Sequence, residues 1–97
     1  MSRPTKLDTG IEGWMKEHSG WDCDGLKSVT RTYQFKTFGD AVAFVMKLAL
    51  LAEKHDHHPD IDLRFSKVRV MWSTHDAGGL TRMDLALAEV TDTLAGV

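Results

Sequence analysis

The sequence predicts an α+β fold, in which three helices pack on one face of a four-stranded antiparallel sheet in the order α-β-β-α-β-β-α. Two pairs of short runs alternate apolar and polar residues, at 21–36 and 60–73, and each pair is joined by a link short enough for a hairpin. Between the pairs lies a long apolar run, residues 41–52, which has the length and composition of a helix. Helix start signals precede that run and also the C-terminal segment.

The N-terminal part is expected to hold a loose leader, a short helix and the first hairpin. Residues 1–7 form the leader, and Asp8 or Thr9 is placed to cap the helix. In the second strand of the hairpin, Arg31 falls on the apolar side and is expected to snorkel to solvent or to meet an acidic side chain. The two expected strands cover residues 21–23 and 26–36.

The central helix is expected to begin after Thr37 and to run to about Lys54. Thr37 is a good N-cap, and Asp40 stands three residues later, as in a capping box. Residues 41–52 are apolar nearly all round, whereas a helix that lies on one sheet needs only a stripe about 100° wide. We therefore expect the surplus apolar face to be buried in a homodimer or homotetramer, assembled through this helix and a sheet edge.

The second hairpin is expected to hold strands at residues 60–65 and 67–73. Alternate positions of these strands are apolar: Ile61, Leu63 and Phe65 in the first, and Val68, Val70 and Trp72 in the second. These two sets must face the same core, which restricts the register of the pair.

That register brings two histidine-containing stretches together. If pairing continues beyond the strands, His75 falls opposite His58 or Asp56, with Cβ atoms about 5 Å apart. Pro59 keeps the preceding residue extended, and successive side chains of an extended chain alternate in direction. His57 and His58 are therefore expected to point in different directions.

The last helix is expected after a turn at residues 76–80. Thr81 and Asp84 have the spacing of a capping box, and the helix that they open runs to about Leu94.

Composition limits the classes of function. At 97 residues the chain is expected to form one domain, residues 1–97. A net charge of -2, without a lysine or arginine run, argues against direct binding of nucleic acid. Cys23 is the single cysteine, no apolar run near the N-terminus resembles a signal peptide, and the longest apolar run is too short to cross a bilayer. We expect a cytoplasmic protein without a membrane segment.

Four of the five histidines lie in two short stretches, residues 53–60 and 73–81. Imidazole titrates near neutral pH, so grouped histidines are candidates for acid/base catalysis. Two alternatives remain open: plain surface or capping histidines, and a zinc site built from His55, His57 and His75. The zinc alternative has no CxxC or HExxH spacing to support it.

The spacing of these residues resembles that of the pterin-4a-carbinolamine dehydratases. Residues in the family pattern are Glu53, His57-His58-Pro59, an aromatic at Phe65, His75, and Asp84 after Gly78-Gly79-Leu80-Thr81. Weaker similarity extends upstream through Gly20-Trp21, residues 31–35 and residues 38–44. The resemblance covers about residues 21–95 and departs from animal members at Ile61 and Phe65, which we expect to be packing residues.

The resemblance implies loss of water from 4a-hydroxytetrahydropterin, without a metal or redox cofactor, in tetrahydrobiopterin recycling linked to an aromatic amino-acid hydroxylase. It implies that His57, His58 and His75 are catalytic and that the pterin lies against residues 57–59 and 74–77. The expected pterin contacts are therefore His57, His58, Pro59, Thr74, His75, Asp76 and Ala77. We expect His57 and His75 to be the acid/base pair and His58 to orient the ring.

Two acidic residues are expected to support the site. Glu53 is either a solvated residue or a group that fixes the tautomer of an imidazole, and Asp84 is either a helix cap or a member of the catalytic group. A non-catalytic interaction module, a coactivator or an assembly factor, is the alternative function, because relatives of these kinds exist in the family. Retention of all three histidines favours the enzyme.

Overall fold

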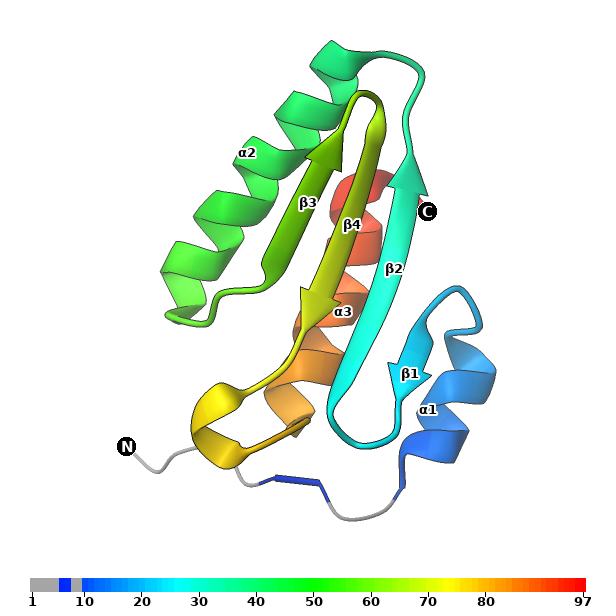
Figure 1. The fold of residues 1–97 in the computed structure, drawn as a ribbon, viewed down its shortest axis with the longest axis vertical. Coiled ribbons are helices and arrows are strands. Elements are labelled where there is room, and N and C mark those ends of the chain that lie inside the picture. The colour runs from blue at the N-terminus through cyan, green and yellow to red at the C-terminus, as the bar shows by residue number, and fades with distance from the viewer. Residues whose placement is uncertain (1–5, 8–9) are drawn as a thin grey trace.

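The computed structural model describes residues 6–7 and 10–97 and confirms the predicted α+β class and element order (Figure 1). The elements are α1 (Ile11–Glu17), β1 (Asp22–Asp24), β2 (Ser28–Gln34), α2 (Phe38–His55), β3 (Asp60–Arg64), β4 (Lys67–Trp72) and α3 (Arg82–Ala95). A short 3-10 turn, His75–Ala77, lies between β4 and α3.

The four strands form one antiparallel sheet in the order β1-β2-β4-β3. The two hairpins of the sequence therefore meet through their second strands, since β2 pairs with β4 along nearly its whole length, from Val29 opposite Trp72 to Gln34 opposite Lys67. In the β3–β4 hairpin Leu63 faces Val68, which is one of the two registers that the apolar pattern allows.

Helices α2 and α3 lie side by side across one face of the sheet and enclose the core with it. Alternation along the strands determines which side chains enter this core. The buried apolar side chains of the sheet are Val29, Tyr33, Val68, Val70 and Trp72, and those of the two helices are Ala41, Phe44, Leu48, Ala52, Leu87 and Ala88. The other side of the sheet carries polar and charged residues, and the described helices leave it open.

Helix α1 docks beside β1 through polar contacts with α3. Its N-cap is Gly10, and the residues expected to cap it, Asp8 and Thr9, lie outside the described residues. The Trp14 indole nitrogen donates to the Glu89 carboxylate at 3.1 Å, and the Trp14 ring stacks on His18. Of the expected leader, residues 6–7 are described, and the backbone nitrogen of Leu7 donates to the carbonyl oxygen of Leu80 at 2.7 Å.

A half-buried carboxylate on α3 ties the helix to β2. Asp92 accepts hydrogen bonds from Trp21 (3.1 Å), from the Arg31 guanidinium (3.0 Å) and from the Tyr33 hydroxyl (2.6 Å). Arg31, the charged residue on the apolar side of β2, thus meets an acidic partner, as one of the two expectations proposed.

Helix α2 begins as the sequence predicts, since the Thr37 hydroxyl accepts a hydrogen bond from the Asp40 backbone nitrogen at 3.0 Å. Its outer side is unusually apolar. Phe38, Met46 and Leu50 are 53%, 62% and 69% exposed, respectively. The surplus apolar face inferred from the sequence is therefore uncovered in a single chain.

The prediction that Phe65 packs in the core as a strand residue is wrong. Strand β3 ends at Arg64, and Phe65 is the first residue of the two-residue turn to β4, with φ of 57° and 79% of its surface exposed. The turn interrupts the alternation, so the last apolar residue of the run does not reach the core. Its ring instead contacts the exposed ring of Phe38.

Candidate functional site

The links that follow α2 and β4 lie at the same end of the molecule and enclose a hollow of about 200 Å³. All three histidines of the expected site line it. The lining residues are Asp56, His57, His58, Ser73, Thr74, His75 and Asp76.

The link between α2 and β3 is short and tightly turned. Asp56 ends α2 in the left-handed conformation (φ 48°), and the backbone nitrogen of His57 still donates to the Ala52 carbonyl oxygen at 3.1 Å. Strand β3 begins at Asp60, directly after Pro59. His57 and His58 are therefore held between a helix end and a strand start, as the sequence predicts.

His75 reaches the hollow by a different route from the expected one. The β3–β4 ladder ends at Asp60 and Met71, so strand pairing does not place His75 opposite His58 or Asp56, and that expectation is wrong. His75 instead begins the 3-10 turn, which is closed where the Thr74 and Gly79 backbones exchange hydrogen bonds of 3.1 and 3.2 Å.

Two glycines allow that turn. Gly78 has φ of 79°, a conformation that glycine adopts without strain. At Gly79 the backbone passes close to the β1–β2 loop, where a Cβ would lie 2.6 Å from the Leu26 carbonyl oxygen. That oxygen accepts a hydrogen bond from the backbone nitrogen of Leu80 at 2.9 Å, so the turn carrying His75 is anchored to the other hairpin.

His57 is the most restrained of the three histidines. Its Nε2 lies 2.6 Å from Oδ1 of Asp84, and 12% of the His57 side chain is exposed against none of the Asp84 side chain. Because an ionised carboxylate only accepts, Nε2 carries a hydrogen and donates it. The nitrogen left to exchange protons is therefore Nδ1.

Asp84 is both a helix cap and the partner of His57. Its Oδ2 accepts from the Thr74 hydroxyl (2.6 Å) and from the Thr81 backbone nitrogen (2.9 Å), the second of which completes the predicted capping box. The sequence left open whether Asp84 is a helix cap or a member of the site. Its Oδ2 caps α3, whereas its Oδ1 accepts the hydrogen bond from His57. A fully buried carboxylate is thereby satisfied by hydrogen bonds and by one ionisable partner.

His58 and His75 are exposed. The Nε2 of His58 lies 2.8 Å from Oε1 of Glu53, and both side chains are more than half exposed. Such a surface pair contributes little to stability, but it fixes which nitrogen of His58 carries the hydrogen. Among the described residues, we find no hydrogen bond to the ring of His75.

Two of the expected pterin contacts lie outside the hollow. Pro59 and Ala77 do not line it, whereas Asp56 and Ser73, which the sequence did not indicate, do. Sequence reasoning also missed Trp72, whose ring is parallel to that of His57 (4° between planes, 5.5 Å between centroids). Its alternating position marked it only as a core residue of β4.

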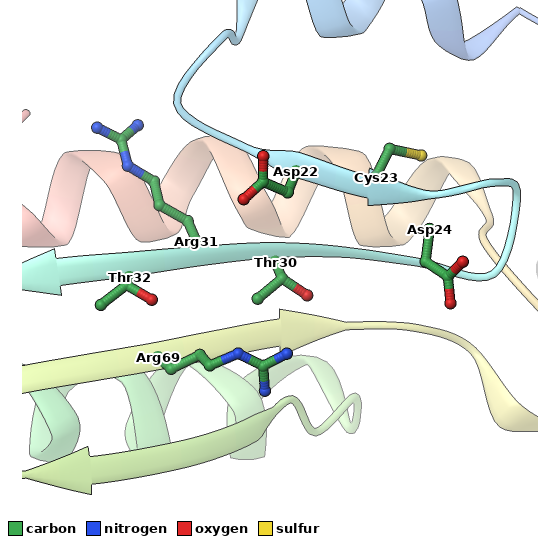
Figure 2. Close-up of a pocket in the computed structure, with 7 residues that line it drawn as sticks. All are labelled: Asp22, Cys23, Asp24, Thr30, Arg31, Thr32 and Arg69. Atoms are coloured by element: carbon green, nitrogen blue, oxygen red, sulfur yellow. The ribbon is translucent and has the colours of Figure 1, made fainter.

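A second hollow, of about 280 Å³, lies away from the histidines and is shown in Figure 2. It is lined by Asp22, Cys23, Asp24, Thr30, Arg31, Thr32 and Arg69. Burial, with smaller effects from Asp24 and Glu12, raises the pKa of the Cys23 thiol and so disfavours the reactive thiolate. This hollow has no group suited to exchange protons near neutral pH.

Within the described part of the chain, no three His, Cys, Asp or Glu side chains are grouped as metal ligands would be. The described helices also include none with the length and hydropathy needed to cross a membrane.

Comparison with known proteins shows the family to which this chain belongs. The family described as Pterin 4 alpha carbinolamine dehydratase matches residues 5–94. A protein of Thermomicrobium roseum, provisionally named pterin-4-alpha-carbinolamine dehydratase, is 44% identical over 88 residues, which are 91% of this chain and 94% of the relative. A protein of Chloroflexus aggregans with the same provisional name is 43% identical over 82 residues, which are 84% of this chain and 87% of the relative.

Two solved structures share the fold. A transcriptional coactivator/pterin dehydratase from Brucella melitensis has a TM-score of 0.85 and 32% identity, over 95% of this chain and 99% of that one. A pterin dehydratase-like protein, identified as a RuBisCO assembly factor in the alpha-carboxysome, has a TM-score of 0.69 and 25% identity, over 81% and 93% of the two chains. The match over nearly the whole sequence shows that this chain belongs to the pterin-4-alpha-carbinolamine dehydratase family.

Proposed function

We propose that this protein removes water from 4a-hydroxytetrahydropterin to give quinonoid dihydropterin, by histidine acid/base catalysis. The observation that carries the proposal is the grouping of His57, His58 and His75 around one hollow, with two of them bonded to carboxylates. Membership of the dehydratase family supports the same reaction.

The reaction needs a base for a ring N–H and an acid for the departing hydroxyl. His57 suits the base, because its Nδ1 can accept the proton while Nε2 remains bonded to Asp84. The imidazolium that forms is stabilised by this buried carboxylate at 2.6 Å.

His75 suits the acid, because its ring is exposed at the hollow and can be protonated again from solvent. In the proposed step, a proton from His75 joins the 4a-hydroxyl, the C4a–O bond breaks and water leaves. The pterin N–H electrons form the new C=N bond, and the proton passes to His57. Proton exchange with solvent restores both histidines.

The remaining residues are proposed to bind and orient the pterin. His58 has Glu53 on its Nε2, which leaves Nδ1 for a hydrogen bond to the ligand, and Thr74 and Asp76 line the same hollow. The Thr74 hydroxyl donates to Asp84 and therefore supports the site indirectly. Pro59 and Ala77 lie next to lining residues and are proposed to shape the rim.

The chemistry also suggests where the substrate originates. A 4a-hydroxypterin forms when a tetrahydropterin-dependent hydroxylase transfers one oxygen atom, so we propose that this protein serves tetrahydrobiopterin recycling beside an aromatic amino-acid hydroxylase.

Stopped-flow absorbance of freshly generated 4a-carbinolamine tests the reaction. We expect the wild-type protein to accelerate dehydration, and His57→Ala and His75→Ala each to lower kcat by about 10²-fold or more, the usual contribution of a positioned acid or base. His58→Ala is expected to raise KM more than it lowers kcat.

His55→Ala is the matched control, because His55 is exposed on the last turn of α2 and does not line the hollow. Wild-type turnover in the His57 and His75 variants would contradict the assignment.

A binding role is the second candidate, because the two structural neighbours are described as a coactivator/dehydratase and as an assembly factor. The apolar outer side of α2 favours an interaction, and we propose a second copy of this chain as its occupant. Asp40 lies in the first turn of α2 and Lys54 in the last, so two antiparallel copies bring unlike charges together. The proposed assembly is a homodimer or, with a sheet edge added, a homotetramer.

A further inference from the structure

The buried indole of Trp72 stacks against the ring of His57. The indole is fully buried at the end of β4 and lies parallel to the imidazole, with 5.5 Å between ring centroids and 4° between planes. This is the offset-stacked arrangement that aromatic rings favour. Trp72 does not line the hollow itself, but its ring stacks on that of His57, which does.

The orientation of the indole is fixed from α3. Its Nε1 donates to the Thr91 hydroxyl at 3.0 Å, and that hydroxyl donates in turn to the Leu87 carbonyl oxygen at 2.6 Å. Trp72 and Thr91 are both fully buried. Because a hydroxyl has one hydrogen, its donation to Leu87 leaves a lone pair for the indole, and the direction of both bonds is determined.

Two contacts at right angles therefore hold the imidazole of His57. The hydrogen bond to Asp84 fixes the ring within its plane, and the indole face restricts tilting out of that plane. A rotation that moved Nδ1 would break the buried bond to Asp84 or lift the ring from Trp72. The charge that His57 takes up with a proton also meets an aromatic face, which attracts cations.

We infer that Trp72 and Thr91 are a positioning pair for His57, which keeps Nδ1 directed at the ligand. The kinetic part of this inference rests on the proposed dehydratase function, whereas the part that concerns ring orientation does not. Simple core packing is the competing explanation, and a variant that only disturbs packing is needed to separate the two.

Trp21 is a suitable control. It is buried to almost the same degree and also donates its Nε1 to a side chain on α3, that of Asp92, at 3.1 Å. Its ring contacts Trp14 and Tyr33 and not His57. Trp21→Leu and Trp72→Leu thus remove similar packing and similar hydrogen bonds, but only Trp72→Leu removes the ring that stacks on His57.

Imidazole ¹⁵N–¹H spectra give a readout that is independent of turnover. In the wild-type protein we expect His57 as a single Nε2–H tautomer, with a downfield proton protected from exchange by the bond to Asp84. We expect Trp72→Leu to broaden this signal or to mix the tautomers, and Trp21→Leu to leave it unchanged. Trp72→Phe, which keeps an aromatic face, should retain most of the wild-type pattern.

Kinetics give the second readout. Trp72→Leu should lower kcat by about 10- to 100-fold, the usual effect of a misplaced catalytic group, with KM changed by less than about threefold. Thr91→Val, which keeps the side-chain shape but removes the acceptor, should lower kcat by less, and Trp72→Phe should restore kcat toward wild type. If Trp72→Leu does not fold, the comparison of Thr91→Val and Trp72→Phe with wild type and Trp21→Leu tests the inference alone.

The inference is overturned if the Trp72 and Thr91 variants keep the wild-type His57 signal and lose no more kcat than Trp21→Leu. If the His57 signal changes as expected but the wild-type protein fails to accelerate dehydration, the proposed function fails while the positioning role stands.

Discussion

At the scale of single residues, the site depends on one buried carboxylate. Asp84 caps the N-terminus of α3, accepts a hydrogen bond from Thr74 and fixes the tautomer of His57, all from a side chain with no exposed surface. Its two oxygens meet donors on both sides, so no neutral side chain of the same shape can replace it without leaving a donor unpaired.

Asp84→Asn tests this dependence. The amide has one acceptor oxygen and places N–H hydrogens against the hydroxyl of Thr74 or the ring of His57, so the tautomer of His57 is no longer enforced. We expect the free energy of unfolding in urea to fall by about 1–3 kcal/mol and kcat to fall by about 10²-fold or more. Asp62→Asn, an exposed carboxylate paired with Arg64, is the control and should change neither quantity appreciably. An Asn variant with wild-type turnover would show that the carboxylate is only a cap.

The buried hydroxyl of Tyr33 should make the protein less stable at alkaline pH. Burial, then its hydrogen bond to Asp92 and the charge of that carboxylate, raise the pKa of the Tyr33 hydroxyl, while Arg31 lowers it to a smaller extent. The unfolded tyrosine ionises near pH 10, so the stabilisation is complete below about pH 10 and is lost as pH rises toward the folded pKa. Over that range the free energy of unfolding should fall by up to about 1.4 kcal/mol per pH unit from this group alone.

The measurement is urea unfolding of wild type and Tyr33→Phe on both sides of pH 10. The variant lacks the titrating group, so the difference in free energy of unfolding between the two proteins should shrink as pH rises. Because the chain has one tyrosine, absorbance of tyrosinate follows the same group directly. A constant difference, or tyrosinate formation near pH 10 in the folded protein, would refute the assignment.

At the scale of elements, the turn between β4 and α3 is the part that places His75. Gly79→Ala should destabilise the protein, because a Cβ there would lie 2.6 Å from the Leu26 carbonyl oxygen, a backbone atom that cannot move without the β1–β2 loop. We expect a loss of about 1–3 kcal/mol, as for overpacking in a core, together with a lower kcat from a displaced His75. Gly13→Ala is the control: its Cβ meets nothing within 4 Å in α1, so it should stabilise by about 0.5–1 kcal/mol. Equal effects of both substitutions on thermal unfolding would contradict this account.

The elements that the sequence predicted well are those with local signals. The cap at Thr37 and the capping box of Thr81 and Asp84 each join residues three apart, so both long helices begin where expected. Strand alternation likewise identified the core faces of β2 and β4. The turn at Phe65 was missed because an exposed aromatic residue with positive φ looks, in sequence, like one more apolar strand position.

The sequence predicts that three histidines share one site, and they do line one hollow, but it does not predict how that hollow is built. The histidines were recognised by their grouping and by family resemblance. His75, however, lies on a 3-10 turn, which the register of the β3–β4 pair does not predict. The stacking of Trp72 on His57 depends on how α3 and β4 pack together, and nothing local in the sequence reports that packing.

At the scale of the whole molecule, the sheet and helices bury one apolar core but leave the apolar outer side of α2 uncovered. The core side of α2 is filled by Ala41, Phe44 and Leu48, but Met46 and Leu50 project from its outer side. A helix with two apolar sides is typical of a subunit that is complete only in an assembly.

Sedimentation velocity tests this assembly with Met46→Glu, Leu50→Glu and the control Ala86→Glu. Met46 and Leu50 project from the outer side of α2, whereas Ala86 is exposed on α3. We expect the wild-type protein to sediment as a dimer or tetramer and both α2 variants to shift toward the monomer. An unpaired carboxylate buried between helices costs several kcal/mol, and each ~1.4 kcal/mol changes the dissociation constant about tenfold. Ala86→Glu adds the same charge to an exposed position on a different helix and should sediment as the wild type does. If wild type is already a monomer at micromolar concentration, or if Ala86→Glu dissociates as readily as the α2 variants, the outer side of α2 is not a surface for self-association.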